Sequence, residues 1–178
     1  VAVGSYYAGA HIIHIDGSYG GTGAAPDIAK KNIAMPVEYA IPRVHRFLVE
    51  EGIRDEVVLI ASGGIRTAHD VLKAIALGAD GAVVGTSELV SLGCIRCGNC
   101  ESGRGCARGI ATTDRELIKQ IDIDWATQRL INMYAAWRTQ MVDVLAQFGM
   151  KSVSELRGRH DCLRRVRWEE EEGGGSDV

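Results

Sequence analysis

VVLIASGGIRTAHDVLKAIALGADGAVVGT, residues 57–86, contains two apolar runs that each lead into a glycine loop. The first run, residues 57–61, is apolar throughout, as expected for a strand that is covered on both faces. Thr67 and Asp70 have the spacing of a capping box at the start of a helix, and Gly78 ends that helix. These signals predict one complete β/α unit followed by a second strand.

The same alternation extends to both sides of this stretch. Residues 82–84 predict the second strand, which ends at the loop VGTSE. Upstream, HIIHI at residues 11–15 predicts an earlier strand that meets a glycine-rich loop at 17–23. A helical pattern follows at residues 36–51, in which Pro42 predicts a kink or a later start. Strands that alternate with helices in this way predict a parallel sheet and an α/β fold.

The character of the sequence changes after residue 124. Apolar side chains then recur every three or four residues up to residue 148, which predicts a long amphipathic helix that packs against the preceding domain. These side chains are Leu130, Tyr134, Trp137, Met141, Val144, Leu145 and Phe148. The last residues, 166–178, are acidic and rich in glycine, and this composition predicts disorder.

Size and composition limit the classes of function. The 178 residues suffice for one domain with a core, or for part of a larger domain. A formal net charge of −3 gives no electrostatic reason to expect a nucleic-acid partner. No apolar run reaches the roughly 18 residues that a membrane-spanning helix needs, so no membrane partner is expected. The chain starts without Met and without a basic signal region, which predicts an interior piece of a longer protein.

Four of the five cysteines form a cluster with C-x2-C-x2-C-x5-C spacing; they are Cys94, Cys97, Cys100 and Cys106. Disulfide scaffolds are small and rich in cysteine throughout, unlike this chain, so a reducing cytoplasm is expected. The spacing favours ferredoxin-type iron–sulfur ligation, while structural zinc and free thiols stay open as alternatives. The nearby Arg96, Arg104 and Arg108 would offset the negative charge of a cluster. Cys162 is interpreted as an ordinary side chain.

Two glycine loops, ASGGIR at 61–66 and VGTSE at 84–88, each follow an apolar strand and precede a helix. Backbone N–H groups at such positions favour a bound phosphate, and two such loops in successive β/α units strengthen that prediction. The longer loop GSYGGTGAAP is interpreted either as a surface loop or as the rim of an active site that a flat cofactor approaches. Asp16 at a strand end and Arg66 beside the first loop are candidate functional residues, whereas His14 is expected to be a packed side chain.

The order of these motifs resembles the FMN-binding barrel of the glutamate synthase large subunit, in its archaeal type. The likeness rests on HIIHIDGSYGGTGAAP, on VVLIASGGIRTAHDVLKAIALGADGAVVGTSELVSLGC, on the cysteine loop and on MKSVSELRGRHD, and it covers about residues 10–160. The phosphate-loop segment is also similar to IMP dehydrogenase, but the chain lacks that family's catalytic cysteine loop. The cysteine cluster belongs to the glutamate synthase pattern.

The resemblance implies a fold and a cofactor. The fold would be the C-terminal part of a TIM (β/α)8 barrel, strands 6 to 8, in residues 1–92, then an iron–sulfur loop at 93–113 and a helical extension at 114–165. The residues that would hold the FMN phosphate are Gly63, Gly64, Gly85 and Thr86, and those that would lie near the flavin or the substrate are Gly20, Gly21 and Thr22. Three strands do not close a barrel, so the chain alone is expected to be inactive.

The reaction of the family that this chain resembles is the reductive transfer of glutamine-derived ammonia to 2-oxoglutarate, with electrons passing through an iron–sulfur cluster to FMN. The implied partners are a glutaminase domain or subunit, and ferredoxin or an NAD(P)H-oxidising subunit as electron donor. Bacterial relatives have three cluster cysteines, and Cys97 is additional here, which favours a 4Fe-4S cluster over the alternative 3Fe-4S. Another FMN-dependent barrel oxidoreductase and a non-catalytic electron-transfer module are the alternative functions.

Overall fold

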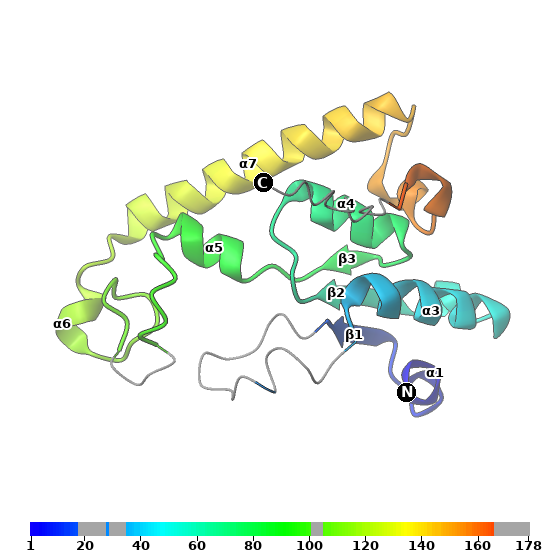
Figure 1. Cartoon of the computed structure of the whole chain (residues 1–178), viewed down its shortest axis with the longest axis horizontal. Coiled ribbons are helices and arrows are strands. Elements are labelled where there is room, and N and C mark those ends of the chain that lie inside the picture. Colours follow the sequence, from blue (N-terminus) through cyan, green and yellow to red (C-terminus); the bar gives the residue numbers. More distant parts are fainter. Residues whose placement is uncertain (18–27, 29–34, 101–104, 166–178) are drawn as a thin grey trace, which may run out of the picture.

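Three parallel strands form one sheet in the computed structural model, which describes residues 1–17, 28, 35–100 and 105–165. The strands are β1 (Ile12–Asp16), β2 (Val58–Ser62) and β3 (Gly81–Ala82), and β2 lies between the other two (Figure 1). Ile13 of β1 pairs with Leu59 of β2. The predicted parallel α/β arrangement is confirmed, but the third strand is shorter than the predicted 82–84, because only Gly81 and Ala82 pair with β2.

Helices alternate with these strands as the sequence predicts. They are α1 (Ala2–Tyr7), α3 (Val37–Glu50), α4 (Ala68–Ala76), α5 (Thr86–Ser91), α6 (Arg115–Ile118) and α7 (Ile123–Gln147), with short 3-10 turns η1 (Arg54–Glu56), η2 (Val153–Leu156) and η3 (His160–Cys162). The helix predicted at 36–51 is α3, which begins directly after Pro36 and continues through Pro42. The short helix α1 was not predicted.

The capping box predicted at Thr67 and Asp70 is present at the start of α4. The Asp70 N–H donates to Thr67 Oγ1 at 3.2 Å, and the Thr67 N–H donates to Asp70 Oδ2 at 3.0 Å. Gly78, just after the helix, has a φ of +116°, and a Cβ there would lie 2.3 Å from Cγ of His45. Both ends of α4 are therefore fixed by local sequence, which also fixes where the preceding loop ends.

Two apolar clusters hold the elements together. The first packs α3 and α4 on the sheet, and its buried members include Ile13, Ile41, Leu48, Leu59, Ala61 and Ala74. The second joins α4 to the end of α7 and to the segment after it, through the buried Leu72, Ile75, Ala76, Leu145, Met150 and Leu156. In Figure 1, α4 accordingly lies between the sheet and the end of α7.

Helix α7 spans nearly the predicted residues, but its apolar face is more exposed than predicted. Leu145 near its end is buried, whereas Tyr134 and Phe148 are 44% and 49% exposed. The middle of its apolar face lines a hollow of about 700 Å³ beside β3 rather than packing directly on the sheet. Although α7 is the longest described helix, neither it nor any other helix in the described residues is long and apolar enough to cross a membrane.

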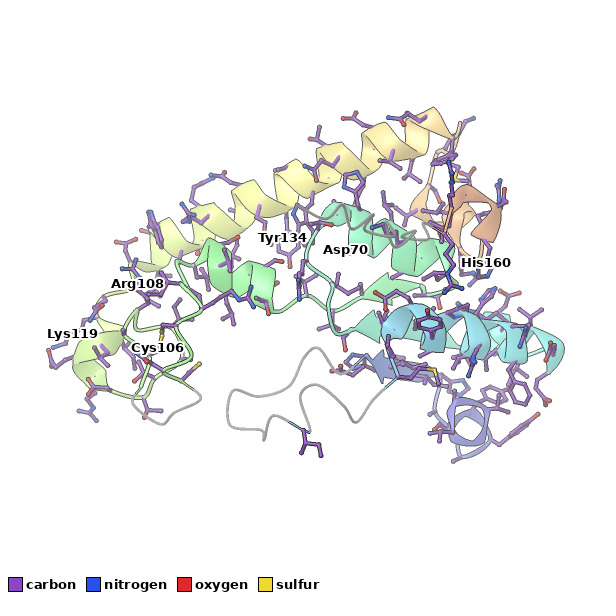
Figure 2. The ribbon with its side chains drawn as sticks, viewed as in Figure 1. Asp70, Cys106, Arg108, Lys119, Tyr134 and His160 are labelled. Atoms are coloured by element: carbon purple, nitrogen blue, oxygen red, sulfur yellow. The ribbon has the colours of Figure 1, made fainter. Side chains whose placement is uncertain are left out.

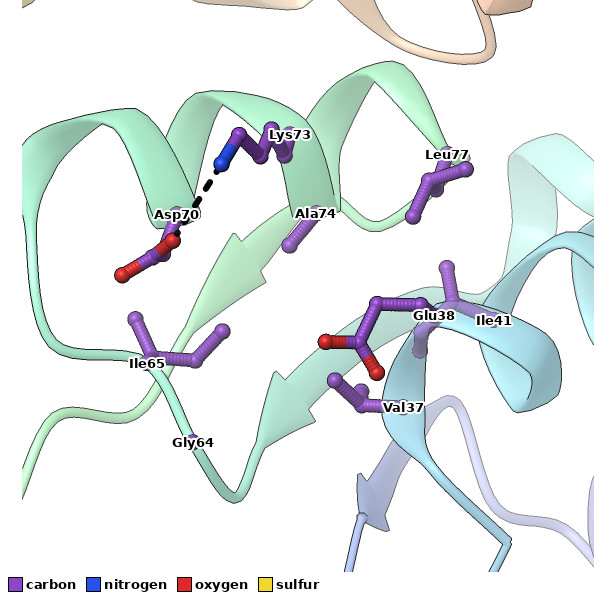
Figure 3. Close-up of a pocket in the computed structure, with 9 residues that line it drawn as sticks. All are labelled: Val37, Glu38, Ile41, Gly64, Ile65, Asp70, Lys73, Ala74 and Leu77. Atoms are coloured by element: carbon purple, nitrogen blue, oxygen red, sulfur yellow. Dashed lines mark ion pairs between the residues drawn. The ribbon is translucent and has the colours of Figure 1, made fainter. Parts of the chain in front are cut away.

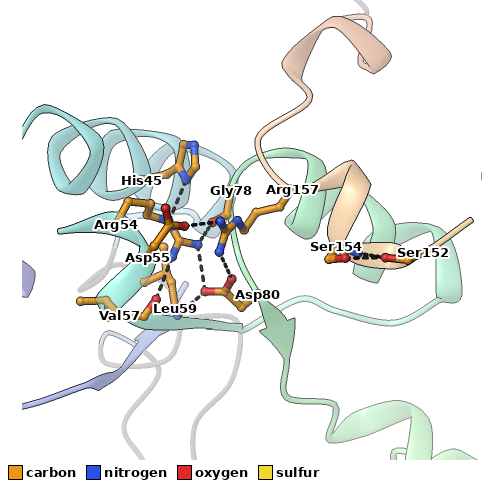
Figure 4. A network of polar contacts seen from close by, with 10 residues as sticks. All are labelled: His45, Arg54, Asp55, Val57, Leu59, Gly78, Asp80, Ser152, Ser154 and Arg157. Atoms are coloured by element: carbon orange, nitrogen blue, oxygen red, sulfur yellow. Dashed lines mark hydrogen bonds and ion pairs between the residues drawn. The ribbon is translucent and has the colours of Figure 1, made fainter. Parts of the chain in front are cut away.

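An ionic network ties the C-terminal segment to the amino-terminal side of the sheet (Figure 4). Arg54 is 5% exposed and donates to Asp80 Oδ2 at 2.8 Å and to the Gly78 carbonyl at 2.7 Å. Arg157 donates to Asp80 Oδ1 at 2.9 Å and to Asp55 Oδ1 at 2.5 Å. The Asp80 carboxylate therefore joins an arginine that precedes β2 to one that follows α7.

Candidate functional site

The carboxyl ends of the strands open into a hollow of about 310 Å³, which we call the strand-end hollow. This is the edge of a parallel sheet at which α/β proteins bind ligands. Its lining includes Gly63, Gly64, Gly85 and Thr86, the four residues expected to hold a phosphate, and Arg66. The structure therefore places the two glycine loops around one space, although they are separated by the whole of α4.

The first loop has a backbone that only glycine adopts readily. Gly63 and Gly64 have φ values of +87° and +83°, in the left-handed region. A Cβ at Gly63 would lie 2.8 Å from both Asp16 Oδ1 and the Gly17 nitrogen. The Gly17 N–H in turn donates to the Ser62 carbonyl at 2.9 Å, so the end of β1 packs directly against this loop.

The second loop requires glycine less strictly than the first loop does. Gly85 has a negative φ of −132° with a ψ of −72°, and a Cβ there would meet no atom of the described residues within 4 Å. No steric clash therefore requires glycine at this position. What glycine does is leave the strand-end hollow open beside Thr86.

Hydrogen bonds connect the two loops and use some of their amides. Ser87 Oγ donates to the Arg66 carbonyl at 2.7 Å. The N–H groups of Arg66 and Thr67 donate to Asp70 Oδ2 at 3.2 and 3.0 Å. Because the capping box uses these two amides, donors for a phosphate would have to come from the glycines, from Thr86 and from side chains. The side chain of Arg66 is exposed on the lining of the strand-end hollow.

His14 is not the packed histidine expected from the sequence. It is exposed on the lining of the strand-end hollow, and its Nε2 lies 2.7 Å from Ser62 Oγ. Asp16, two residues further along β1, lines the same hollow as expected of a strand end. The spacing of two places both residues on one face of the strand, and this alternation was the signal in the sequence for His14.

A smaller cavity of about 180 Å³ lies on the other side of the first loop, between α3 and α4 (Figure 3). Gly64 lines both spaces. The walls of this cavity are otherwise apolar or carry Glu38, Asp70 and Lys73, and the Lys73 ammonium is already paired with Asp70 at 3.6 Å. Two carboxylates make this side unfavourable for a phosphate, whereas the strand-end hollow carries arginine.

The described part of the cysteine loop, residues 93–100 and 105–113, lies beyond the carboxyl ends of the strands, near the start of α7 (Figures 1 and 2). Cys97 and Cys100 are exposed, Cys94 is half-buried and Cys106 is buried. Within the described part of the chain, no group of three or more His, Cys, Asp or Glu side chains is placed to hold a metal ion. Residues 101–104, which connect Cys100 to Cys106, lie outside the described residues.

Cys106 has the surroundings of a thiolate. Hydrogen bonds from the backbone N–H of Ala111, and also from Arg108, Ile110 and Gly109, lower the pKa of the Cys106 thiol against the opposite effect of burial. Donors of this kind favour the anionic form of sulfur that binds metals. The loop is closed by Arg108, whose Nε donates to the Gly93 carbonyl at 3.2 Å.

Three sets of predicted residues fall outside the described residues. They are Gly20, Gly21 and Thr22, expected near a flavin or substrate; Arg104, expected to offset the charge of a cluster; and the tail at 166–178. The expectations for these residues stay predictions.

A solved structure of a mutant flavocytochrome b2 with pyruvate bound is similar to this chain, with a TM-score of 0.51. The match covers 88% of this chain and 30% of that one at 16% sequence identity. At this identity the likeness concerns the fold alone. It agrees with the parallel α/β arrangement described above.

Sequence comparisons are more specific. The family model described as a conserved region in glutamate synthase matches residues 1–151. The archaeal glutamate synthase [NADPH] of Methanocaldococcus jannaschii is 45% identical over 172 residues, which are 97% of this chain and 34% of that protein. The ferredoxin-dependent glutamate synthase of Cyanidium caldarium is 35% identical over 92% of this chain and 10% of its own length.

The chain thus spans about a third of the length of its archaeal-type relatives, a share that recurs in the archaeal-type glutamate synthase [NADPH] of Dehalococcoides mccartyi, at 45% identity and 33% of that protein. The family model covers most of the chain and includes the sheet, the two glycine loops and the cysteine loop. This chain belongs to the glutamate synthase family.

Proposed function

We propose that this chain is the part of a glutamate synthase that binds FMN and an iron–sulfur cluster. The observation that carries the proposal is that two glycine loops, separated by α4, face one hollow at the carboxyl ends of the strands. Family membership supports the same reading. The reaction would be the reductive amination of 2-oxoglutarate with glutamine-derived ammonia.

The strand-end hollow fits the phosphate of FMN. Gly63 and Gly64 hold the backbone of the first loop in a conformation that side chains disfavour, and the bond from Ser87 to Arg66 fixes the second loop against it. Arg66 adds a positive charge to the lining. FMN would supply hydride chemistry when bound, while the residues of this chain would hold its phosphate and orient it. Gly20, Gly21 and Thr22 are proposed to lie beside the flavin or the substrate.

The three strands would be strands 6 to 8 of a β/α barrel. In the described residues β1 and β3 each pair with β2 alone, and open apolar hollows of about 690 and 700 Å³ lie beside them. Closing a barrel requires more strands, which the remaining two thirds of an archaeal-type relative would supply. We therefore expect the complete protein, and not this chain alone, to be active.

The cysteine loop would hold the cluster. We assign Cys94, Cys97, Cys100 and Cys106 as ligands of a 4Fe-4S cluster, with 3Fe-4S as the alternative if Cys97 does not bind. Spacing supports this assignment, as do the backbone donors around Cys106. The proposed electron donor is ferredoxin or an NAD(P)H-oxidising subunit, and a glutaminase domain or subunit would deliver ammonia.

The test uses the full-length protein that contains this chain, loaded with FMN and iron–sulfur cluster. It should form glutamate from 2-oxoglutarate and either glutamine or ammonia when a low-potential reductant is supplied. Gly64→Val should lose FMN but keep the visible absorbance of the cluster, because the side chain would distort a loop with positive φ. Gly4→Val, at an open position in α1, is the matched control and should keep both.

Two results would contradict the proposal. If the Gly64→Val protein retained stoichiometric FMN, the phosphate loops would be wrongly assigned. If cofactor-replete protein formed no glutamate with either nitrogen source, another FMN-dependent barrel oxidoreductase would be favoured instead.

A further inference from the structure

We propose that Arg96, which belongs to the cysteine loop, supplies a second guanidinium to the phosphate of FMN. The inference rests on the FMN site proposed above and adds a residue from a different part of the chain. It makes the loop that carries the cysteines a wall of the flavin site.

The first observation is where Arg96 lies. It follows Cys94 by two residues and immediately precedes Cys97, yet it lines the strand-end hollow together with both glycine loops. Of the described arginines, only Arg66 and Arg96 line that hollow. A phosphate held between the loops would therefore meet one arginine from the first glycine loop and one from the cysteine loop.

The second observation is the backbone of Arg96. Its φ of +53° is the only positive value at a non-glycine residue within the described residues. Such a conformation is disfavoured for a residue with a Cβ, and it persists where the surroundings hold it. Here the Arg96 N–H donates to Cys94 Sγ at 3.4 Å, so one end of the residue is fixed to the cysteine loop.

The third observation is the charge balance in the strand-end hollow. Asp16 places a carboxylate on the same lining and would repel a phosphate dianion. The backbone N–H groups of Arg66 and Thr67 already donate hydrogen bonds to the Asp70 carboxylate. A second guanidinium would offset the carboxylate and replace the missing donors, since arginine binds phosphate oxygens through paired N–H groups.

Two neighbouring arginines in the described part of this region make contacts elsewhere. Arg108 donates to the Gly93 carbonyl, and Arg129 donates to the Ser91 carbonyl at 2.5 Å while lying over the ring of Trp125. Neither lines the strand-end hollow.

The experiment compares FMN with riboflavin, which has the same ring system but no phosphate. Binding of each to flavin-free full-length protein is measured by quenching of flavin fluorescence. The informative variant is Arg96→Gly, because glycine accepts a φ of +53° and the loop backbone is kept. Arg96→Lys retains the charge without the paired donors, and Arg115→Ala, at an exposed position on α6, is the control.

Arg96→Gly is expected to weaken FMN binding about tenfold or more, in line with the loss of a charge-assisted hydrogen bond, and to leave riboflavin binding unchanged. Arg96→Lys should bind FMN with an affinity between those of Arg96→Gly and the wild type, and Arg115→Ala should match the wild type.

Unchanged FMN binding in Arg96→Gly would refute the role of Arg96 but not the FMN site. Equal weakening of FMN and riboflavin would also refute it, because the phosphate would not be the group recognised. Failure of the wild type to bind FMN would instead refute the FMN site itself, and with it this inference.

Discussion

Gly63 and Gly85 both follow a strand, but they differ in backbone conformation and in the space around them. Gly63 has a positive φ, and a Cβ there would press on Asp16 and Gly17. Gly85 has an ordinary φ and open space around it. A positive φ and close contacts explain the first glycine, whereas neither applies to the second.

Alanine at each position separates the two cases. Gly63→Ala is expected to lower the free energy of unfolding by about 1–3 kcal/mol, since the left-handed backbone is disfavoured and the Cβ has to displace the end of β1. Gly85→Ala should change it by less than about 0.5 kcal/mol, as for an unstrained exposed position. Urea unfolding of the three proteins measures both values. Equal losses would show that the two loops are not held differently.

Cys97 decides which cluster the cysteine loop would carry. In Cys97→Ser, a 4Fe-4S cluster is expected to lose one iron and convert to 3Fe-4S, because three thiolates leave one iron position without a protein ligand. Anaerobic iron counting and electron paramagnetic resonance detect the change. Cys162→Ser, outside the loop, is the control and should leave the spectrum as in the wild type. Identical spectra for wild type and Cys97→Ser would mean that Cys97 is not a ligand.

At the scale of helices and strands, the features that could best be predicted from the sequence are those set by neighbouring residues. Helix α4 was predictable from both ends, because Thr67 and Asp70 cap it and Gly78 ends it. The extent of β3 was not, since a strand ends where its pairing with β2 ends. The exposure of Tyr134 on α7 was also missed, because a periodic pattern gives a helix its apolar face but not the surface that covers it.

In the candidate site, too, features set by local sequence were predictable and features set by tertiary contacts were not. The glycine loops were predictable because strand, glycine and helix occur in order along the chain. Arg96 was not, since it reaches the strand-end hollow from a loop that follows α5 and has a backbone conformation no local rule assigns to arginine. Contacts between segments distant in sequence are set by tertiary packing.

The ionic network of Figure 4 also joins elements, and it contains a histidine. A Cβ at Gly158 would lie 2.7 Å from Nε2 of His45, and a Cβ at Gly78 would lie 2.3 Å from Cγ of the same ring, so the ring fills the space beside both glycines. Arg54 Nε donates to His45 Nδ1 at 2.9 Å, so that nitrogen carries no proton. Burial, and then the charges of Arg54, His160 and Arg157, lower the pKa of His45.

This geometry predicts a loss of stability in mild acid. Below the ordinary histidine pKa of about 6.5 the unfolded chain takes up a proton that folded His45 resists, so the free energy of unfolding decreases as the pH falls. The contribution is complete above that value and is lost as the pH falls through the lowered pKa of folded His45. Unfolding midpoints between pH 7 and 5 measure the slope. His45→Gln should flatten it, and His69→Gln, exposed on α4, should not; an unchanged slope in His45→Gln would exclude His45 as its source.

At more acidic pH the same network has a second titrating group. Burial would raise the pKa of Asp80, but hydrogen bonds from the Leu59 N–H, Arg157 and Arg54 outweigh it and leave that pKa below its usual value. The contribution of Asp80 is therefore present above the usual aspartate range and is lost as the pH falls through the lowered value. The titrations of His45 and Asp80 therefore both decrease the free energy of unfolding as the pH falls.

At the scale of the whole molecule, the three-stranded sheet of the described residues has two outer strands and too few strands to close. Ile12 on β1 is 70% exposed and Val83 next to β3 is 49% exposed, beside the two large apolar hollows. In a protein the length of the archaeal-type relatives, further strands would cover both sides. Within the described residues, no further strand pairs with the outer edge of β1 or of β3.

The chain alone is therefore expected to associate with itself, because outer strands with unpaired backbone groups and apolar side chains pair readily with other strands. Light scattering over a range of protein concentrations should show mass increasing with concentration. Ile12→Lys should reduce this association, since a charged side chain on an outer strand opposes pairing with a second copy. The matched control is Ile123→Lys, because Ile123 is 72% exposed but lies at the start of α7, away from the sheet. If both lysine variants reduced association equally, general surface charge would explain it, and the outer strand β1 would not be the surface responsible.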